Sequence, residues 1–336
     1  MIYLIGSTLL VAALLFMLDG RERAIERPFN EDDIGDDLDA YLDAEEARIE
    51  GIREGTQKQI IWADPNQKSA TRISVIYIHG YTATMGEIRP VPDLVAQALD
   101  ANLYYTRLTG HGLDGDSLAK ARRGDWQRDM EEAIAIGREL GEKVLILSTS
   151  TGSAAAVCDV IGAANEDDIL GIVQISPNYR LHDPRSFVLD WPFARWIAPL
   201  VAGRRQKAKY RSDQQAHFWD MEFPTKALVQ MAALTRAARN LDFSATRLPS
   251  LFIYCDGDTI IDVAEMRRVM DAWGGPVEAM QLEWQEGDDI ERHVMTGDIL
   301  TPAKTAPVAA EIIRWAKSIQ DKAEHDQDKA EHRNSD

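Results

Sequence analysis

Cysteine is scarce in this 336-residue chain, which contains only Cys158 and Cys255. Both lie in apolar segments, so we expect two buried thiols rather than a disulfide, and neither indicates a redox compartment. Positive charge is also in deficit, because 37 lysines and arginines are set against 55 aspartates and glutamates, which leaves a net charge of −18. This acidic balance opposes binding to nucleic acid.

The N-terminus lacks the features of a cleaved signal peptide. No basic residue precedes the apolar run 2–18, no small-residue cleavage site ends it, and no cysteine that could be lipidated follows it. The run is uncharged and about long enough to cross a bilayer, so it predicts a single-pass anchor within residues 1–20 in a bacterial inner membrane. Because Arg21, Arg23 and Arg27 follow it, the positive-inside rule places the body in the cytoplasm, with the periplasm as the alternative.

Short apolar runs alternate with helical stretches along most of the chain. Helices are expected at 91–99, 126–140 and 261–273, and strands at 59–62, 73–79, 103–108, 143–147, 171–176, 251–255 and 277–284. This alternation predicts one α/β domain, in which a mostly parallel sheet is covered by helices on both faces.

Three further segments differ from this pattern. In the segment 21–56, residues 31–50 are densely acidic with apolar residues at helical spacing, and they predict a solvated helical linker. The interval 181–245 is rich in aromatic residues and predicts a largely helical insertion into a core formed by 57–180 and 246–319. Residues 320–336 repeat the sequence QDKAEH, which is typical of a solvated helix extension or a disordered end.

The strongest local signal is LILSTSTG at residues 145–152, a buried strand that enters a tight turn with Ser150 at its point. A nucleophile in such a turn takes a strained backbone geometry that exposes its hydroxyl, so the residues two before and two after it must be small. Ser148 and Gly152 fill those positions, with Ser148 where glycine is usual. Ser150 is therefore the candidate nucleophile, although a turn or a helix cap has a similar composition.

An earlier predicted strand ends in a glycine turn with the sequence IHGY at residues 78–81. Backbone N–H groups in this turn can face the nucleophile. We expect those of Tyr81 and Thr151 to form an oxyanion hole, because backbone donors are in place before charge develops. The alternative is a plain strand-to-helix turn.

Candidates for the acid and the base follow later strands. We prefer Asp258 as the acid because it lies at the far edge of the turn after 251–255, whereas Asp256 is expected to support that turn. A role for Asp258 as a turn residue remains the alternative. His293 follows the last predicted strand and is the candidate base; the other histidines belong to the tail, the insertion or earlier turns. A neutral imidazole accepts the Ser150 proton while the acid fixes its tautomer.

Three segments, IHGYTATMGEIRPV from Ile78, LTGHGLDGDS from Leu108 and LSTSTG from Leu147, are backed by CDGDTIID and RHVMTGD. With them the chain resembles the α/β-hydrolase superfamily over residues 60–319. Within it, the chain is similar to bacterial hydrolases of the monoacylglycerol lipase-like and serine aminopeptidase-like (S33) type. The resemblance implies that His111, in the Gly-His-Gly loop, borders the substrate pocket as a loop residue rather than as a catalyst.

The resemblance also implies that the insertion at 181–245 forms a cap over the nucleophile and selects the acyl or alcohol part of the substrate. Aromatic side chains suit such a pocket, although they equally suit the core of the cap itself. The candidates for the pocket lining are Trp191, Phe193, Trp196, Phe218 and Trp219.

The candidate residues together predict a serine hydrolase that cleaves carboxylic esters, lipid-derived or monoacylglycerol-like, through an acyl-Ser150 intermediate. No metal or organic cofactor is expected. One triad also serves thioesterases, amidases and aminopeptidases, and these remain alternatives. A membrane-tethered binding protein without turnover is the alternative of another class. The expected partners are a small ester or lipid and, through the anchor, a membrane; the sequence leaves the oligomeric state open.

Overall fold

The computed structural model describes residues 28–163 and 165–334. Its centre is a seven-stranded sheet in the order β1-β3-β2-β4-β5-β8-β9, parallel throughout except for the edge strand β1. Each strand overlaps one predicted strand, so the mostly parallel sheet is confirmed. The strands are β1 (Gln59–Ile61), β2 (Thr71–Ile78), β3 (Asn102–Tyr105), β4 (Gly141–Thr149), β5 (Ile169–Ile175), β8 (Ser250–Tyr254) and β9 (Val277–Gln281).

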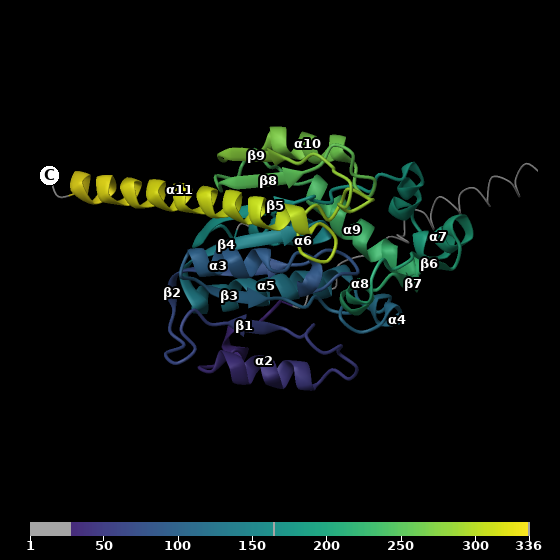
Figure 1. The fold of residues 1–336 in the computed structure, drawn as a ribbon, viewed down its shortest axis with the longest axis horizontal. Coiled ribbons are helices and arrows are strands. Elements are labelled where there is room, and N and C mark those ends of the chain that lie inside the picture. The colour runs from purple at the N-terminus through teal and green to yellow at the C-terminus, as the bar shows by residue number, and fades with distance from the viewer. Residues whose placement is uncertain (1–27, 164, 335–336) are drawn as a thin grey trace, which may run out of the picture.

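Helices cover both faces of this sheet (Figure 1). Successive side chains of a strand point to opposite faces. In β2, Ile76 and Ile78 belong to the hydrophobic cluster that includes residues of α5, α6 and α10, whereas Val75 and Tyr77 belong to the cluster that includes residues of α3 and α11. The helices are α3 (Val91–Ala98), α5 (Arg123–Leu140), α6 (Thr151–Val160), α10 (Val263–Ala272) and α11 (Pro302–Asn334), and α11 continues through both copies of the QDKAEH repeat.

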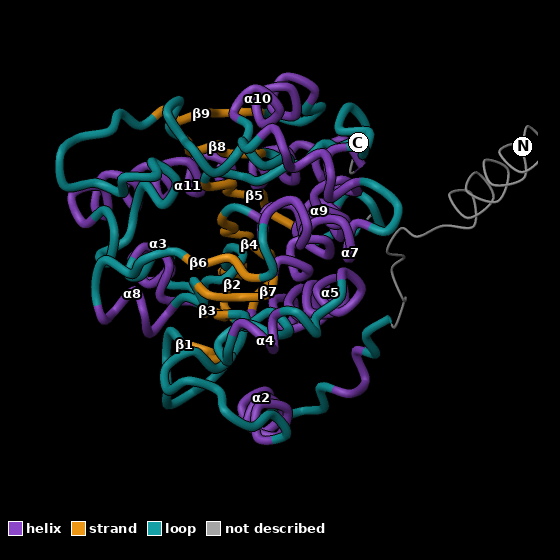
Figure 2. Tube along the Cα trace, turned by 90° about the vertical axis from the view of Figure 1, so that its right-hand side faces the viewer, coloured by secondary structure: helices purple, strands orange, loops and turns teal. Residues whose placement is uncertain are grey.

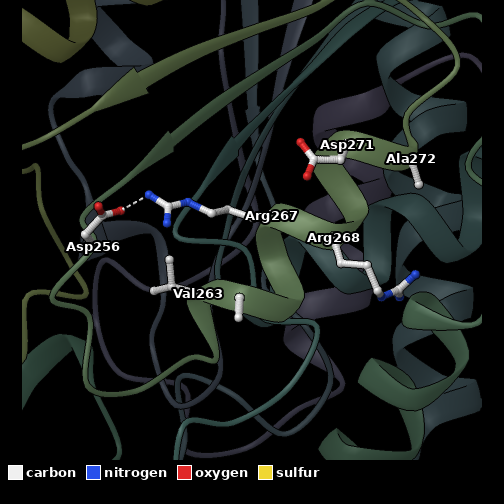
Figure 3. A pocket seen from close by; sticks show the side chains of 7 residues that line it. Asp256, Val263, Arg267, Arg268, Asp271 and Ala272 are labelled. Carbon is white, nitrogen blue, oxygen red and sulfur yellow. Dashed lines mark hydrogen bonds and ion pairs between the residues drawn. The ribbon is translucent and has the colours of Figure 1, made fainter.

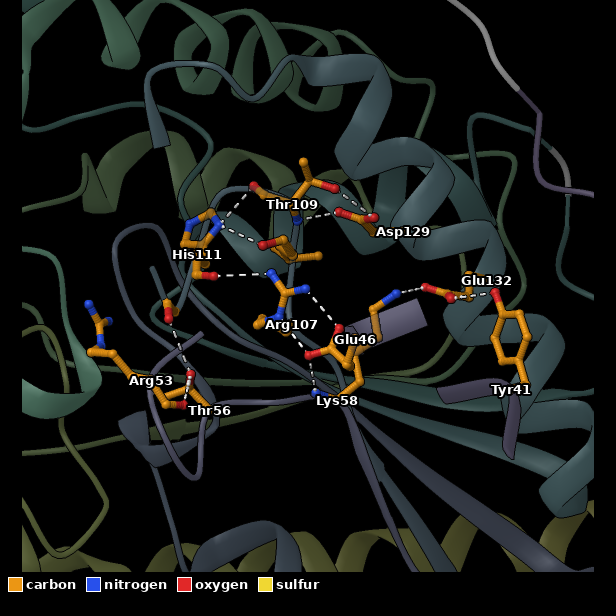
Figure 4. A network of polar contacts seen from close by, with 12 residues as sticks. Tyr41, Glu46, Arg53, Thr56, Lys58, Arg107, Thr109, His111, Asp129 and Glu132 are labelled. Carbon is orange, nitrogen blue, oxygen red and sulfur yellow. Dashed lines mark hydrogen bonds and ion pairs between the residues drawn. The ribbon is translucent and has the colours of Figure 1, made fainter. Parts of the chain in front are cut away.

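The acidic N-terminal stretch is packed against the body rather than solvated. It forms η1 (Glu31–Asp33) and α2 (Leu38–Ala47), and α2 lies beside β1 (Figure 1). Glu46 of α2 is buried and accepts hydrogen bonds from Arg107 at 2.7 and 2.9 Å, within a larger polar network (Figure 4). The expectation of a solvated linker is therefore wrong for this helix, because its acidic residues include the partner of a buried arginine.

Between β5 and β8 the chain leaves the sheet and forms the predicted interval of extra structure, which lies at one end of the molecule (Figure 1). Figure 2 looks onto that end, with the short antiparallel pair β6–β7 in front of the sheet. That residues 181–245 form a cap distinct from the core stays a prediction. Its elements are η3 (Pro184–Asp190), α7 (Ala194–Ala202), β6 (Arg205–Lys207), α8 (Asp213–Phe218), β7 (Glu222–Pro224), η4 (Thr225–Ala227) and α9 (Leu228–Arg239); elsewhere lie η2 (Met85–Glu87) and α4 (Gly115–Leu118).

The prediction of a membrane anchor has to be corrected. Across 28–163 and 165–334, no helix combines the length and the apolar character needed to cross a bilayer. The predicted span, within residues 1–20, lies outside the described residues. This finding overturns the placement of the protein in a bacterial inner membrane through a single-pass anchor, and with it the inferred side of the membrane.

Candidate active site

Ser150 lies between the last residue of β4 and the first residue of α6, in a strained backbone conformation. Its φ of 52° and ψ of −120° are unusual for a residue with a side chain and cost free energy that the surroundings must supply. The surrounding backbone holds this geometry, because the Ser150 N–H donates to the carbonyl of Ile175 at 2.9 Å and its carbonyl accepts from the N–H of Asn178 at 3.0 Å. The turn therefore presents the hydroxyl in the way that a nucleophile requires.

The positions flanking Ser150 leave little room. A Cβ atom on Gly152 would lie 2.4 Å from the carbonyl oxygen of Ile78, so only glycine fits there. Ser148 fits because its hydroxyl has its own partners: it donates to the Val173 carbonyl at 2.9 Å and lies 3.0 Å from the Ser153 hydroxyl. The departure from glycine at position 148 is thus accommodated inside the sheet.

Three side chains from separate elements form one chain of hydrogen bonds. The Nε2 of His293 lies 2.9 Å from the Oγ of Ser150, and its Nδ1 lies 2.7 Å from the Oδ2 of Asp258. The other oxygen of Asp258 accepts from the N–H groups of Ile260 and Ile261 at 2.8 and 3.0 Å. A carboxylate held in this way keeps the imidazole in the tautomer whose Nε2 can take a proton from the serine.

The electrostatic surroundings make His293 a stronger base than a free histidine. Burial alone lowers the pKa of its imidazole, but the negative charge and hydrogen bond of Asp258 raise it, and Glu87 and Asp289 raise it further. The net result is a pKa above the ordinary value. An imidazolium formed during proton transfer would be stabilised by the same charges.

Asp256, the other candidate acid, lies away from this chain of hydrogen bonds. Its carboxylate accepts from Arg267 at 2.5 Å and from Gln281 at 3.0 Å, beside the groove along α10 shown in Figure 3. Asp262 caps the N-terminus of α10 through the N–H groups of Ala264 and Glu265. Both arrangements are structural, so only Asp258 faces His293.

The expected oxyanion donors lie on two elements that converge on Ser150. Thr151 is the first residue of α6, and the N–H groups of a first helical turn have no acceptor within the helix. The turn after β2 comes so close that a Cβ atom on Gly80 would lie 3.2 Å from the Ser150 Cβ. Tyr81 follows directly and lines the same cavity as Ser150. The geometry is suited to stabilising an oxyanion, and the roles of these two N–H groups remain proposals.

Glu87, which is absent from the residues predicted from the sequence, lies in η2 and lines the cavity. Its side chain is 2% exposed and accepts hydrogen bonds from the Gly80 N–H at 2.7 Å and from the Tyr77 hydroxyl at 2.8 Å. Burial raises the pKa of this carboxyl, although both hydrogen bonds oppose the rise. The residue lies inside the quoted segment IHGYTATMGEIRPV, but no spacing rule distinguishes it from a surface acid.

Ser150 and His293 open onto a cavity of about 550 Å³ beneath the insertion. Most of the wall residues that the insertion contributes lie between 206 and 223 or at the start of α9. The basic run at 204–211, which the sequence analysis did not single out, supplies Lys207, Lys209 and Arg211. The apolar part of the wall includes Leu181, Ala208, Trp219, Met221, Phe223, Leu228, Met231, Ile260, Ile290, Val294 and Leu300.

Of the predicted pocket residues, Trp219 lines this cavity. The other five do not line it: His111, Trp191, Phe193, Trp196 and Phe218. Trp191 and Trp196 are 49% and 62% exposed on the outside of the insertion, and Phe193 lies between them at the start of α7. Phe218 packs over Gly86 instead. Aromatic content alone does not show which side of a short helix faces the sheet.

His111 is buried behind the cavity wall. Its ring lies 4.8 Å from that of His79, and its Nδ1 lies 3.2 Å from the carbonyl of Leu108. Burial lowers the pKa of His111 well below the ordinary value, so it stays neutral. This environment fits a structural loop residue. In the described part of the chain, no three His, Cys, Asp or Glu side chains are grouped to hold a metal ion, and both cysteines are buried and unpaired.

Comparisons with known proteins identify the family of this chain. The family model described as serine aminopeptidase, S33, matches residues 69–283, more than half of the chain. The match includes Ser150 and Asp258 and ends before His293. Over 114 residues the chain is 25% identical to a thermostable monoacylglycerol lipase from Bacillus sp. (strain H-257). The matched segment covers 34% of this chain and 44% of that relative.

Solved structures share the fold at low sequence identity. A structure described with the metagenome-derived lipolytic enzymes LipS and LipT is 19% identical, with a TM-score of 0.65, over 80% of this chain and 99% of that one. The monoacylglycerol lipase of Paleococcus ferrophilus is 14% identical, with a TM-score of 0.54, over 78% and 98%. The predicted α/β-hydrolase fold is thereby confirmed. The chain therefore belongs to the serine aminopeptidase S33 family, whose members are serine hydrolases built on this fold.

Proposed function

We propose that this protein hydrolyses carboxylic esters through an acyl-Ser150 intermediate, and that its substrates are lipid-derived esters such as a monoacylglycerol. The observation that carries the proposal is the hydrogen-bonded chain from Ser150 through His293 to Asp258, at the wall of a largely apolar cavity. The cavity volume of about 550 Å³ lies within the usual range for small-molecule sites. The Bacillus relative named as a monoacylglycerol lipase supports the choice of substrate.

The reaction follows from the positions of the three side chains. His293 Nε2 takes the Ser150 proton as Oγ attacks the ester carbonyl, and the N–H groups of Tyr81 and Thr151 receive the developing oxyanion. Collapse breaks the ester bond, and the alcohol leaves with the proton from His293. Water then attacks the acyl group by the same route, releases the acid and restores Ser150. Asp258 stabilises the imidazolium in both halves of the reaction.

Aminopeptidase activity is the second candidate, because the matching family carries that name. An aminopeptidase has to bind a protonated amine, and three acidic side chains, Glu87, Asp289 and Glu291, line the cavity. All three already have partners. Glu87 accepts from Gly80 and Tyr77, Asp289 pairs with Arg211 at 2.7 Å, and Glu291 accepts from the Thr259 hydroxyl at 2.6 Å. Ester hydrolysis needs no such amine site and fits the apolar wall better.

Labelling with a fluorophosphonate probe tests the nucleophile. We expect wild-type protein and Ser153→Ala to be labelled and Ser150→Ala to remain unlabelled, because Ser153 lies in α6 with its hydroxyl on Ser148. Labelling of Ser150→Ala, or no labelling of folded wild-type protein, would contradict the proposal. The second of these results would favour a binding protein without turnover.

A substrate panel then tests the class of bond that is cleaved. We expect turnover of p-nitrophenyl esters that rises with acyl chain length, because the cavity wall is largely apolar. Acyl-CoA thioesters and aminoacyl anilides serve as the competing classes. Preferential turnover of an anilide would replace the ester proposal with aminopeptidase activity on the same triad.

A further inference from the structure

Asp289 is a buried carboxylate beside the candidate base, and it is unusually well bonded. It lies in the loop between β9 and α11, and its side chain is 3% exposed. Its Oδ2 accepts from the backbone N–H groups of His293 and Val294 at 3.1 and 2.9 Å. Its Oδ1 accepts from the N–H of Glu291 at 3.3 Å. One side chain thus holds the backbone at His293 and just before and after it.

The backbone of Asp289 is also tied into this loop. Its N–H donates to the Thr301 hydroxyl at 3.1 Å, and its carbonyl accepts from the Trp284 indole at 3.0 Å and from the Arg292 N–H at 2.9 Å. Arg292 has a φ of 56°, a strained value for a side chain other than glycine. The residue immediately before His293 is therefore kept in a conformation that Asp289 helps to enforce.

A buried carboxylate needs a counter-ion, and here the insertion supplies it. Nη1 of Arg211 lies 2.7 Å from Oδ1 of Asp289. Arg211 follows β6 and is fixed in turn by its own N–H, which donates to the side chain of Gln215 at 2.8 Å. An uncompensated buried charge is costly, so loss of the arginine would destabilise the Asp289 carboxylate and its hydrogen bonds to the backbone at residues 291, 293 and 294.

We propose that Asp289 is a positioning residue for His293 and that Arg211 is its counter-ion, so that the insertion helps to hold the catalytic base in place. This inference rests on the proposed role of His293 in ester hydrolysis. The insertion would then act on the position of the base as well as on the substrate, because the ion pair joins the segment after β6 to the loop that carries His293.

Neutralising Asp289 and neutralising Arg211 should shift the pKa of His293 in opposite directions. The charged groups that bear on His293 are Asp258 after β8, Glu87 in η2 and Asp289 in its own loop, and all three raise its pKa. Removing the charge of Asp289 would lower that pKa, whereas removing the cation of Arg211 would leave Asp289 less compensated and raise it. Hydrolysis requires the neutral imidazole, so the acid limb of the pH–rate profile follows the pKa.

The test compares kcat/KM against pH for Asp289→Asn, Arg211→Gln and Arg211→Lys, with a p-nitrophenyl ester as substrate. We expect Asp289→Asn to lose on the order of 10- to 100-fold through misplacement of His293, with an acid limb at lower pH by about half a unit to one unit. Arg211→Gln should lose roughly 3- to 10-fold and move the acid limb to higher pH. Arg211→Lys should restore the wild-type limb, because it keeps the charge.

Arg236→Gln is the matched control. Arg236 pairs with Asp190 at 2.8 Å in the same insertion, and neither residue lines the cavity. Its acid limb should stay at the wild-type pH. Folded Asp289→Asn and Arg211→Gln proteins with unshifted limbs would overturn the inference, as would equal shifts in the control. If Asp289→Asn does not fold, the two Arg211 variants decide the matter. An active Ser150→Ala protein would instead overturn the proposed function.

Discussion

Two regions meet at the cavity, the strand ends that carry Ser150 and Asp258 and the insertion that covers them. At the strand ends, backbone hydrogen bonds from adjacent residues or the neighbouring strand fix each polar group, as Ile175 does for Ser150 and Ile260 for Asp258. In the insertion, cavity-lining side chains come from scattered positions between 181 and 231, and two tryptophans face outward. The comparison teaches that backbone geometry sets the chemistry in this molecule, whereas packing between distant segments sets the surface that meets the substrate.

The largest test of this comparison replaces the acid. Asp258→Asn should lower kcat on the order of 10³- to 10⁴-fold, because an amide can hold the wrong imidazole tautomer and cannot stabilise the imidazolium. Asp256→Asn, two residues away and bound to Arg267 at the surface, should stay within about threefold of wild type. Steady-state kinetics on one ester measures both. Similar losses in the two variants would remove Asp258 from the triad.

The second test compares two tryptophans of the insertion. Trp219 is 4% exposed and lines the cavity, whereas Trp196 is 62% exposed. We expect Trp219→Ala to lower the ratio of long-chain to short-chain ester hydrolysis on the order of tenfold, because lost apolar contact weakens binding of the chain. Trp196→Ala should leave that ratio within about twofold. The ratio is insensitive to the fraction of folded enzyme, so an effect of Trp196 equal to that of Trp219 would refute the assignment of the wall.

The third test measures stability at the strand ends rather than activity. Burial lowers the pKa of His79 to about 4, and its ring accepts from the Leu108 N–H at 3.0 Å. The unfolded chain then binds more protons than the folded one between pH 6.5 and 4, so stability falls as the pH is lowered through that window, by up to about 3 kcal/mol. Urea unfolding of His79→Gln should show a shallower pH dependence and a lower stability at pH 8. An unchanged slope would mean that His79 contributes nothing to acid sensitivity.

The same division between strand ends and insertion explains what the sequence could and could not predict. Strands, covering helices and the small residues at 148 and 152 follow from local patterns, since periodicity and turn sterics act over a few residues. Glu46 and Asp289 resemble ordinary acidic residues in the sequence, because their partners Arg107 and Arg211 lie far away along the chain. Glu87 is only seven positions from Gly80, but their contact depends on how the chain turns after β2. The outward orientation of Trp191 and Trp196 depends on how the insertion sits on the sheet, which no local pattern records.

The separation of Ser150 from His293 has a consequence for how the enzyme is made. The two residues are 143 positions apart, with the whole insertion and strands β8 and β9 between them. At roughly 5 to 20 residues per second, a ribosome completes the nucleophile turn on the order of ten seconds before it reaches the base. Under the proposed mechanism, a nascent chain carries a serine with no base to activate it, and we expect any product truncated before residue 293 to be inactive towards esters.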